Sequence, residues 1–427
     1  MQSPAALTGG AWYRLSPRPD RVRATIRVVL DGSLRSRASR VVGAVDPALW
    51  LLAAIGFISQ IGISVMLPLL PLYATELGAP PFVLGLLTSL FAITNAAGQL
   101  GAGFLSERFG ARRMMTAGIA LYATMNALIA TAATAGWLLA WRTSAGFGGG
   151  AMIVSERIYL ARVVEPARRA FANGSVSAGQ SAGTVAGPVF GGLAAAVGGL
   201  RAPFVIVAAT SAIALVGTLF LPAPPPRDGD DRAPDMPDRA DLRPLAALLV
   251  ANAALLASYG GFITTYAPLA TTRLGWSIVE VGIAFSFFGG GSILLGPALA
   301  HLADRLGRRM VATVSPLALM LFGLALVSGM PQPVVFGLAL VAGGGLTAFS
   351  ASWYALLADA AGEHRLDRTF GIINAISTLG IVVGSVTAAE LWQRVDVATG
   401  MLVGVFAPLV TVGAMLAFRP RTVPSTP

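Results

Sequence analysis

Twelve long apolar segments constrain the fold of this 427-residue chain more than any other feature. A helix needs about 20 apolar residues to cross the hydrocarbon core of a bilayer, and each segment provides about that many. The chain is 55% hydrophobic and only 12% charged, so a soluble fold would expose large apolar patches. We therefore predict an all-α membrane protein. Within a few residues, its twelve transmembrane helices are expected at 48–74, 82–105, 112–134, 137–161, 171–197, 203–222, 243–268, 278–302, 310–329, 333–358, 369–392 and 397–418.

A proline-rich, charged stretch separates the sixth segment from the seventh. Pro222 to Pro244 reads PAPPPRDGDDRAPDMPDRADLRP and holds no apolar cluster that could be buried. This composition is typical of a disordered tether. We predict a basic tail, a six-helix bundle, a linker, a second six-helix bundle and a short tail, at 1–45, 46–222, 223–242, 243–418 and 419–427.

The 30 basic residues, all arginine, predict the orientation in the membrane. With the N-terminus in the cytoplasm, eight arginines precede the first segment and eighteen lie in or beside the even-numbered loops and the C-terminal tail. Arg201, Arg273 and Arg394 fall outside, and Arg142 lies within the fourth segment. The positive-inside rule favours this arrangement. We expect a multi-pass protein of the inner (plasma) membrane with both termini cytoplasmic and no nucleic-acid partner. The basic tail either holds anionic lipid as a surface helix or is disordered.

A charged loop occurs twice, at the same place in each half. GFLSERFGARRMM follows the second segment and AHLADRLGRRMV follows the eighth, and aligning Glu107 with Asp304 gives an offset of 304 minus 107, or 197 residues. An acid at the C-terminal end of a helix opposes the helix dipole, so other groups must hold it. Gly110 and Gly307 are expected to allow the reversal between the two helices. An ordinary cytoplasmic turn is the alternative, but the second copy disfavours it. The predicted latch residues are Glu107, Arg108, Gly110, Arg113, Asp304, Arg305, Gly307 and Arg309.

The twelve segments, the central tether and the duplicated loop resemble the major facilitator superfamily from about residue 46 to 418. The resemblance implies two six-helix bundles related by a pseudo-two-fold axis along the membrane normal. It also implies a transporter of small molecules that works by alternating access, and no enzyme. In that family the loop acid joins a charge cluster that latches one conformation. Here Glu107 replaces the usual aspartate, and Ala300 replaces the first glycine of the second copy.

Glycines recur inside the fifth segment, where they would weaken an isolated helix. Four of them fall at intervals of four and line one face, which lets two backbones approach closely in lipid. Pro188 bends the helix by removing a backbone hydrogen bond. We expect the partner to be the eighth segment, with its own FGGGSILLGP at 288–297. The four are Gly179, Gly183, Gly187 and Gly191.

The same stretch, GTVAGPVFGG, is similar to the fifth-helix signature of drug exporters that exchange substrate for protons. The match lies at Gly183, Gly187, Pro188, Gly191 and Gly192. The resemblance implies export, while helix packing is a role that these glycines have in either case.

Two ionisable residues lie within the fourth segment, and a charge at membrane depth indicates a functional site by default. RTSAGFGGG, beginning at Arg142, resembles the fourth-helix motif whose arginine is implicated in proton transfer; alternatively, Arg142 snorkels to the interface beside Trp141. Glu156 lies 14 residues later, within about 40° of the same face, so we expect both in one cavity. Glu156 is the candidate proton carrier; otherwise it meets water or Arg157.

The other polar residues that could line a central cavity are few and uncharged. The predicted cavity is therefore mostly apolar, which suits a lipophilic or amphipathic substrate. Export driven by protons is the predicted function; the alternatives are uptake of a small nutrient by a symporter or facilitator, and a lipid-translocating or sensory role. The first segment offers no acid, which leaves the coupling ion open. The cavity candidates are Gln60, Asn95, Asn126, Gln180, Tyr259, Tyr266, Tyr354 and Asn374.

The remaining expectations concern partners. The absence of cysteine and the presence of only two histidines exclude thiolate and polyhistidine metal sites, so we expect neither metal nor cofactor. Besides its substrate, the chain is expected to bind protons and membrane lipid and to act as a monomer. Glu390 and Arg394, four residues apart, are predicted to pair on one helix.

Overall fold

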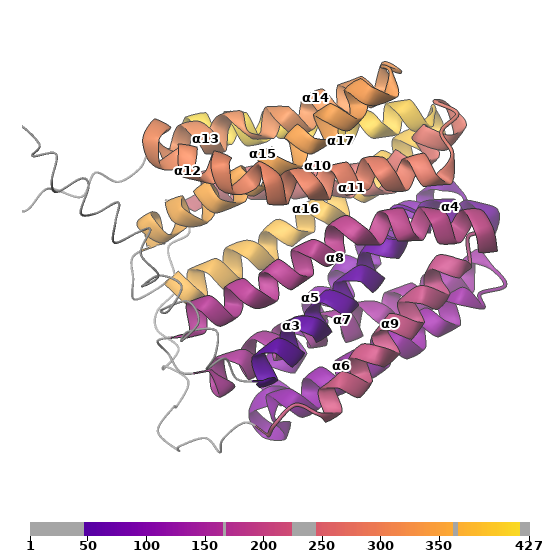
Figure 1. Ribbon diagram of the computed structural model, residues 1–427. Coiled ribbons are helices and arrows are strands. Elements are labelled where there is room, and N and C mark those ends of the chain that lie inside the picture. The colour runs from indigo at the N-terminus through magenta and orange to yellow at the C-terminus, as the bar shows by residue number, and fades with distance from the viewer. Residues whose placement is uncertain (1–46, 165–167, 224–244, 362–365, 419–427) are drawn as a thin grey trace, which may run out of the picture. The chain divides into compact units, whose positions relative to one another are not determined.

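The structure is a computed structural model that describes residues 47–164, 168–223, 245–361 and 366–418. The described residues from Leu51 onward belong to one compact unit, and its helices run alongside one another (Figure 1). The first half contains α3 (Pro47–Met66), α4 (Leu70–Glu76), α5 (Pro81–Phe109), α6 (Ala111–Ala130), α7 (Ala135–Val163), α8 (Arg169–Gly198) and α9 (Ala202–Leu219). The second contains α10 (Ala246–Thr272), α11 (Ile278–Leu294), α12 (Gly296–Leu306), α13 (Arg308–Val314), α14 (Pro316–Val327), α15 (Gln332–Ala361), α16 (Leu366–Arg394) and α17 (Val397–Ala417).

Every predicted segment coincides with one helix or with a consecutive pair. The pairs occur where proline interrupts the backbone hydrogen bonds of a helix. α3 and α4 are separated around Pro68, α11 and α12 meet at a 43° bend just before Pro297, and α13 gives way to α14 at Pro316. By contrast, α8 continues through Pro188.

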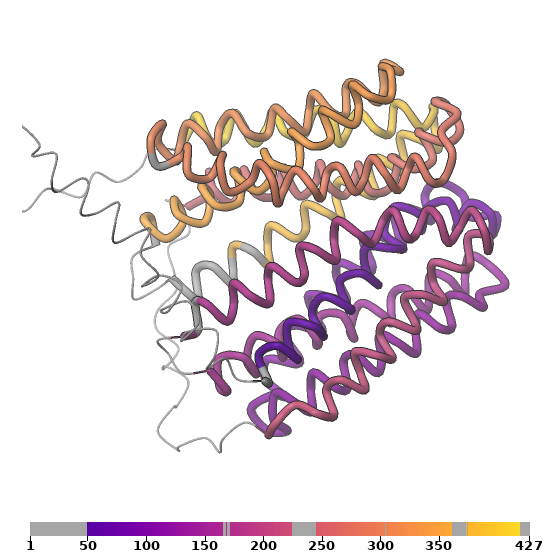
Figure 2. The backbone as a smooth tube through the Cα atoms, in the orientation of Figure 1, coloured from indigo at the N-terminus to yellow at the C-terminus, as the bar shows by residue number. Residues whose placement is uncertain are grey.

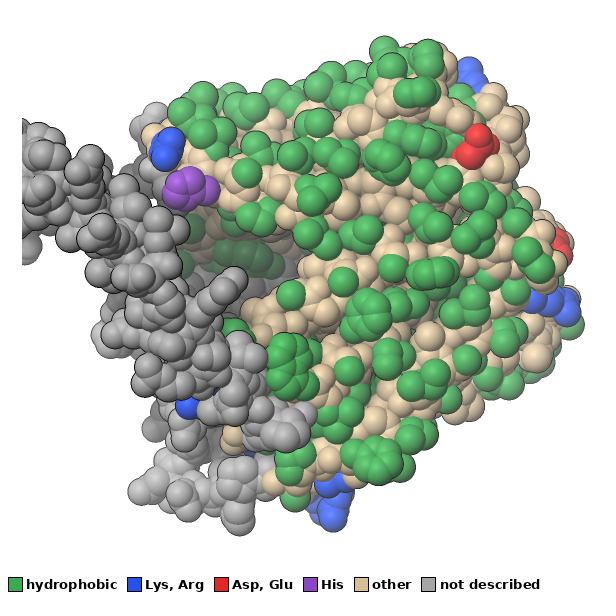
Figure 3. All heavy atoms as spheres, viewed as in Figure 1, with side chains coloured by type: hydrophobic (Ala, Val, Ile, Leu, Met, Phe, Trp, Pro, Cys, Tyr) green, Lys and Arg blue, Asp and Glu red, His purple; other side chains and the backbone are tan. Residues whose placement is uncertain are grey.

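The described residues contain nine spans long and apolar enough to cross a membrane, one of which combines α13 with α14, or ten if α11 and α12 also form one bent span. α6 and α7 fall outside that set, and they carry the polar residues Arg112, Asn126, Arg142 and Glu156. Both helices pack against each other, and α7 also packs against α5. On the face shown in Figure 3, hydrophobic side chains cover the middle of the molecule and the charged ones lie toward its two ends, as in a membrane protein.

The two halves meet mainly along two helix pairs, α5 with α16 and α8 with α11, and α10 adds smaller contacts with α4 and α5 (Figure 2). The predicted linker and both tails lie almost entirely outside the described residues, so the predicted division at 223–242 stays a prediction. The predicted pair of Arg394 and Glu390 is confirmed, with 2.6 Å between Nη2 and Oε1.

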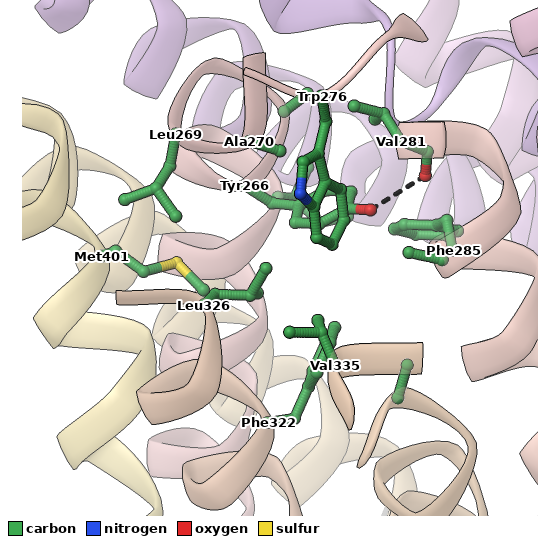
Figure 4. Packing of buried hydrophobic residues seen from close by; sticks show 14 of the residues in the cluster. Tyr266, Leu269, Ala270, Trp276, Val281, Phe285, Phe322, Leu326, Val335 and Met401 are labelled. Carbon is green, nitrogen blue, oxygen red and sulfur yellow. Dashed lines mark hydrogen bonds between the residues drawn. The ribbon is translucent and has the colours of Figure 1, made fainter. Parts of the chain in front are cut away.

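The core of the second half is a cluster of aromatic and aliphatic side chains (Figure 4). Tyr266 lies in it, 1% exposed, and its hydroxyl donates a 2.8 Å hydrogen bond to the carbonyl of Val281. Phe262 stacks on Tyr266 with 4.8 Å between ring centroids. The hydrogen bond between Tyr266 and Val281 joins α10 to α11, so Tyr266 acts in helix packing here.

The glycine face of α8 packs against α3, and not against the eighth segment as the sequence suggested. A Cβ atom at Gly183 would lie 2.8 Å from the carbonyl oxygen of Phe57, and one at Gly187 would lie 2.6 Å from Cβ of Ser64. One at Gly191 would clash with the carbonyl oxygen of Val65. The reason is angular: residues at intervals of four share one face of a helix, and α11 lies beside another.

α11 contacts that other face of α8. A Cβ atom at Gly289 would lie 3.4 Å from the Thr184 carbonyl oxygen, and one at Gly282 would meet the carbonyl of Pro188. Of the predicted partner segment 288–297, Gly291 and Gly296 instead face Leu340 and Thr347 of α15. α8 is therefore held between α3 of its own half and α11 of the other.

The duplicated loop has the same backbone in both halves. Gly110 and Gly307 adopt φ of +87° and +93°, which confirms that they make the reversal between consecutive helices. Arg112 donates from Nε to the Thr218 carbonyl (3.2 Å) and from Nη2 to that of Leu219 (2.7 Å), at the end of α9. Arg309 makes the same two bonds, of 3.2 and 2.6 Å, at the end of α17.

The acceptors of Arg309 are the carbonyls of Met415 and Leu416, so donor and acceptors both repeat at 197 residues (309 minus 112; 415 minus 218). Arg112 is thus the equivalent of Arg309, whereas the predicted latch residue Arg113 corresponds to Met310 and is exposed. Arg112 and Arg309 each donate to carbonyls that have no partner within their own helix. Each also places a positive charge at the C-terminal end of that helix, which is the negative end of the helix dipole.

We expect Arg112→Ala and Arg309→Ala each to lower the free energy of unfolding by roughly 1–2 kcal/mol, because two charge-assisted hydrogen bonds to a helix end are lost. Thermal unfolding of the purified variants in detergent measures this. Arg113→Ala is the matched control and should unfold like the parent. Equal losses in Arg112→Ala and Arg113→Ala would contradict the assignment.

Candidate functional site

A cavity of about 490 Å³ lies between α5 and α7 of the first half and α10 and α16 of the second. Its walls are mostly apolar, and Arg142 is the single charged side chain among the described lining residues. The lining residues are Leu67, Leu70, Thr88, Phe91, Ala92, Asn95, Ala96, Gln99, Leu100, Arg142, Val154, Tyr259, Ile263, Ala375, Thr378 and Ile381.

Arg142 is buried at the edge of this cavity, with only 3% of its surface exposed. Its guanidinium lies over the ring of Phe91, 3.7 Å from the centroid, and Nη1 approaches Sδ of Met66 at 3.7 Å. Nε has no hydrogen-bond partner among the described residues. Arg142 thus points into the protein, so the alternative that it snorkels to the interface is wrong.

Polar groups line the cavity near Arg142. Asn95 donates a long 3.4 Å bond to the Gly146 carbonyl and accepts a 2.7 Å bond from Gln99. Tyr259 of α10 also lines the cavity. The sequence thus identified Asn95 and Tyr259 as cavity residues, but it missed Phe91, one turn before Asn95 on the same face of α5.

Glu156 lines a different cavity, of about 190 Å³, within the first half. Only 7% of its surface is exposed, and both carboxylate oxygens accept from Nε2 of Gln180, at 3.3 and 3.5 Å. Gly56 of α3 is close by, since a Cβ there would lie 3.4 Å from Oε1. Gln60 lines the same cavity. Of the carboxylates whose side chains the structure describes, Glu156 alone is buried.

The expectation that Arg142 and Glu156 face one cavity is therefore wrong. They share a side of α7, but 14 residues separate them by about 21 Å along the axis. Over that length the neighbours of α7 change: Arg142 lies beside Phe91 of α5, whereas Glu156 lies beside Gln180 of α8. The sequence gives the helical angle of a residue but not which helices surround it at each depth.

The other predicted cavity residues line neither cavity or lie outside the description. Asn126 is fully buried and donates a 2.7 Å bond to the Tyr122 carbonyl. Tyr354 is 44% exposed on α15. The side chains of Asn374 and of Asp304 lie outside the described residues.

The remaining latch residues are placed as follows. Glu107, Arg108 and Arg305 are exposed near the ends of α5 and α12, and Arg108 lies 5.4 Å from the ring of Phe109. The predicted latch stays a prediction.

The halves make close backbone contacts at one end of the central cavity. A Cβ at Gly85 of α5 would lie 2.8 Å from the Ser385 carbonyl oxygen of α16, and the Phe82 amide donates a 3.2 Å bond to Oε1 of Gln393. At the other end of α5, a Cβ at Gly101 or Gly103 would meet nothing within 4 Å. The cavity lining begins beyond the contact of Gly85 with Ser385 and runs from Thr88 to Leu100 on α5, toward the end where α5 finishes.

At the end where α5 contacts α16, which we call the closed end, an ion pair stabilises the connection between α16 and α17. Asp396 accepts a 3.3 Å bond from Arg273 and a 2.8 Å bond from the Thr399 amide, which caps α17. The hydrogen bonds from the Thr399 side chain and amide hold the pKa of Asp396 below its usual value. It therefore stays ionised and able to pair with Arg273 at neutral pH.

Comparison with known proteins gives consistent matches. The family model of the Major Facilitator Superfamily matches residues 52–385 and 248–427. Multidrug resistance protein MdtG of Proteus mirabilis (strain HI4320) is 34% identical over 169 residues, which are 38% of this chain and 42% of that protein. The class E tetracycline resistance protein of Escherichia coli is 26% identical over 356 residues, 79% of this chain and 86% of that protein. The chain thus matches less than half the length of MdtG.

Two solved structures have the same fold at low sequence identity. A bacterial homolog of the human lysosomal transporter Spinster, in an inward-facing and occupied conformation, gives a TM-score of 0.70 at 17% identity, over 88% of this chain and 95% of that one. The nucleoside transporter NupG gives 0.68 at 15% identity, over 87% and 98%.

Proposed function

Because this chain belongs to the Major Facilitator Superfamily and is a secondary transporter, we propose that it exports small lipophilic or amphipathic compounds in exchange for protons. The observation that carries the proposal is the pair of separate cavities: a large, mostly apolar one between the halves and a small one that holds a buried carboxylate. The first has the size and character of a drug-sized binding site. The second offers a group that can take up and release a proton inside the membrane.

The asymmetric contact between the halves supports alternating access. The halves touch through α5 with α16 and α8 with α11 at one end, while the cavity extends toward the end that carries the linker. With the linker in the cytoplasm, as the arginine distribution predicts, this is the inward-facing state. Rocking of the halves about the cavity would then open the opposite end.

Coupling follows from the position of α8. Gln180 of α8 holds Glu156, and Thr184, one turn later, lies against Gly289 of the other half. Protonation of Glu156 removes a buried charge and weakens the charge-assisted bond from Gln180. We infer that this change shifts α8 at its contact with α11, so that the proton controls the closing of the halves without entering the substrate cavity.

The relatives support export. The matched curated proteins include multidrug and tetracycline resistance proteins, and the fifth-helix glycine motif agrees with them. The orientation with both termini in the cytoplasm, the monomeric state and the latch are parts of the same proposal. Uptake of a nutrient is the second candidate, because the fold is also that of the nucleoside transporter NupG.

Proteoliposomes with an acidic lumen test the proposal. Protons leaving down their gradient should drive accumulation of substrate in the lumen if the chain is an antiporter, whichever way it is inserted. Tetraphenylphosphonium, chloramphenicol and taurocholate provide a cationic, a neutral and an anionic probe. Accelerated loss of a probe from the acidic lumen would instead indicate symport and therefore uptake. Protein-free liposomes control for leakage.

A further inference from the structure

We propose that the central cavity binds an amphipathic organic anion, whose carboxylate or sulfonate pairs with Arg142 while the apolar walls cover its hydrocarbon body. This inference rests on the proposed function, since it names the class of substrate that the same cavity would carry. It distinguishes this chain from a carrier of lipophilic cations.

The first argument is that Arg142 is a buried cation without a counter-ion. It is 97% buried, and its described neighbours, which include the face of Phe91, the sulfur of Met66 and the phenol of Tyr122, contain no carboxylate. An aromatic face and a thioether attract the guanidinium but do not neutralise it. Nε remains without a partner among the described residues. A charge held at membrane depth in this way is costly unless an anion pairs with it.

The second argument is the imbalance of polar groups on the cavity wall. Tyr259 lines the cavity with a hydroxyl that can donate, and Asn95 adds an amide whose bond to the Gly146 carbonyl is long, at 3.4 Å. No carboxylate occurs among the described residues that line it. A lipophilic cation would therefore meet a like charge without an acid to offset it, whereas an anion would meet the guanidinium together with hydroxyl and amide groups that can donate to it.

The third argument sets the rest of the ligand. Beyond Arg142 the walls carry aliphatic groups such as Leu67, Leu70, Ile263 and Ile381. A volume of about 490 Å³ accommodates a drug-sized body. Because one arginine balances one charge, the ligand is a monoanion; a dianion would leave a second charge without a partner in apolar surroundings.

The test uses three ligands with one naphthyl body: 2-naphthylacetate, 2-naphthylacetamide and 2-(2-naphthyl)ethylamine. Calorimetry measures their binding to the purified full chain in lipid nanodiscs. The parent should bind the carboxylate at least about 30-fold more tightly than the amine, with the amide between them. Tighter binding of the amine, or no binding of the carboxylate, would overturn the proposal.

Variants then locate the preference. Arg142→Gln should reduce the preference for the carboxylate to about threefold or less, because charge recognition is lost while the apolar walls remain. Arg142→Lys keeps the charge and should keep the order of the three ligands. An unchanged preference in folded Arg142→Gln would overturn the assignment to Arg142. If that variant does not fold, the order in the parent still decides the charge of the ligand.

The outcome is separable from that of the export test. Proton-driven movement of tetraphenylphosphonium, with no binding of naphthylacetate, would support export and overturn the anion site. A preference for naphthylacetate that Arg142→Gln removes, without proton-driven movement of any probe, would support the anion site and contradict export.

Discussion

Glu156→Gln should abolish the coupling of transport to protons and leave substrate exchange intact. Glutamine has nearly the shape of glutamate and can still bond to Gln180, but it cannot take up or release a proton. Substrate accumulation driven by a pH gradient should therefore fall on the order of tenfold or more, as expected when a coupling free energy between two sites is lost. Exchange of labelled for unlabelled substrate across the same liposomes should continue, because the central cavity is unchanged.

The control for this change is Glu390→Gln. Unlike Glu156, which is buried and bonds to the neutral Gln180, Glu390 is partly exposed and pairs with the positively charged Arg394. The same chemical change there should leave accumulation at the parent level. Full accumulation in Glu156→Gln, or equal losses in both variants, would remove Glu156 from the coupling mechanism.

The glycine face of α8 gives the second large effect, and here two substitutions of one kind should have opposite signs. Gly191→Ala places a methyl group against the Val65 carbonyl of α3, so either α8 or α3 must move. Overpacking of this kind costs roughly 1–3 kcal/mol of unfolding free energy. Gly174→Ala, in the same helix, adds a methyl group that meets nothing within 4 Å and should stabilise by up to about 1 kcal/mol through helix propensity.

Thermal unfolding in detergent compares the two variants, and transport shows what the close packing is for. Because α8 also carries the contact with α11, a displaced α8 should slow transport in Gly191→Ala even at temperatures where the variant stays folded. A Gly191→Ala protein as stable as Gly174→Ala would show that the contact between α3 and α8 is looser than described.

Much of the fold was predictable because bilayer thickness sets the length of each apolar segment. All twelve predicted segments contain helices, and both glycine reversals, at Gly110 and Gly307, were identified from the repeated loop. The breaks within segments occur where proline lies inside them. Such features depend on residues that are close in sequence, so one amino-acid sequence is enough to predict them.

The errors share a physical cause, which is that they concern neighbours distant in sequence. The spacing of the α8 glycines revealed a smooth face but not that α3 covers it. The angle between Arg142 and Glu156 was correct, yet different helices surround α7 at the two depths, and two cavities result. The predicted latch set included Arg113 and omitted Arg112, because the carbonyls that accept hydrogen bonds from Arg112 lie about 100 residues away in the sequence.

The most direct test of proton antiport is to measure proton movement while substrate leaves proteoliposomes that hold a pH-sensitive dye. Substrate that runs down its gradient out of the lumen should draw protons in, so the dye should report acidification that grows with the amount of substrate moved. Glu156→Gln should move substrate without that signal. Release of substrate by the parent with no change in luminal pH, or with alkalinisation, would contradict the account.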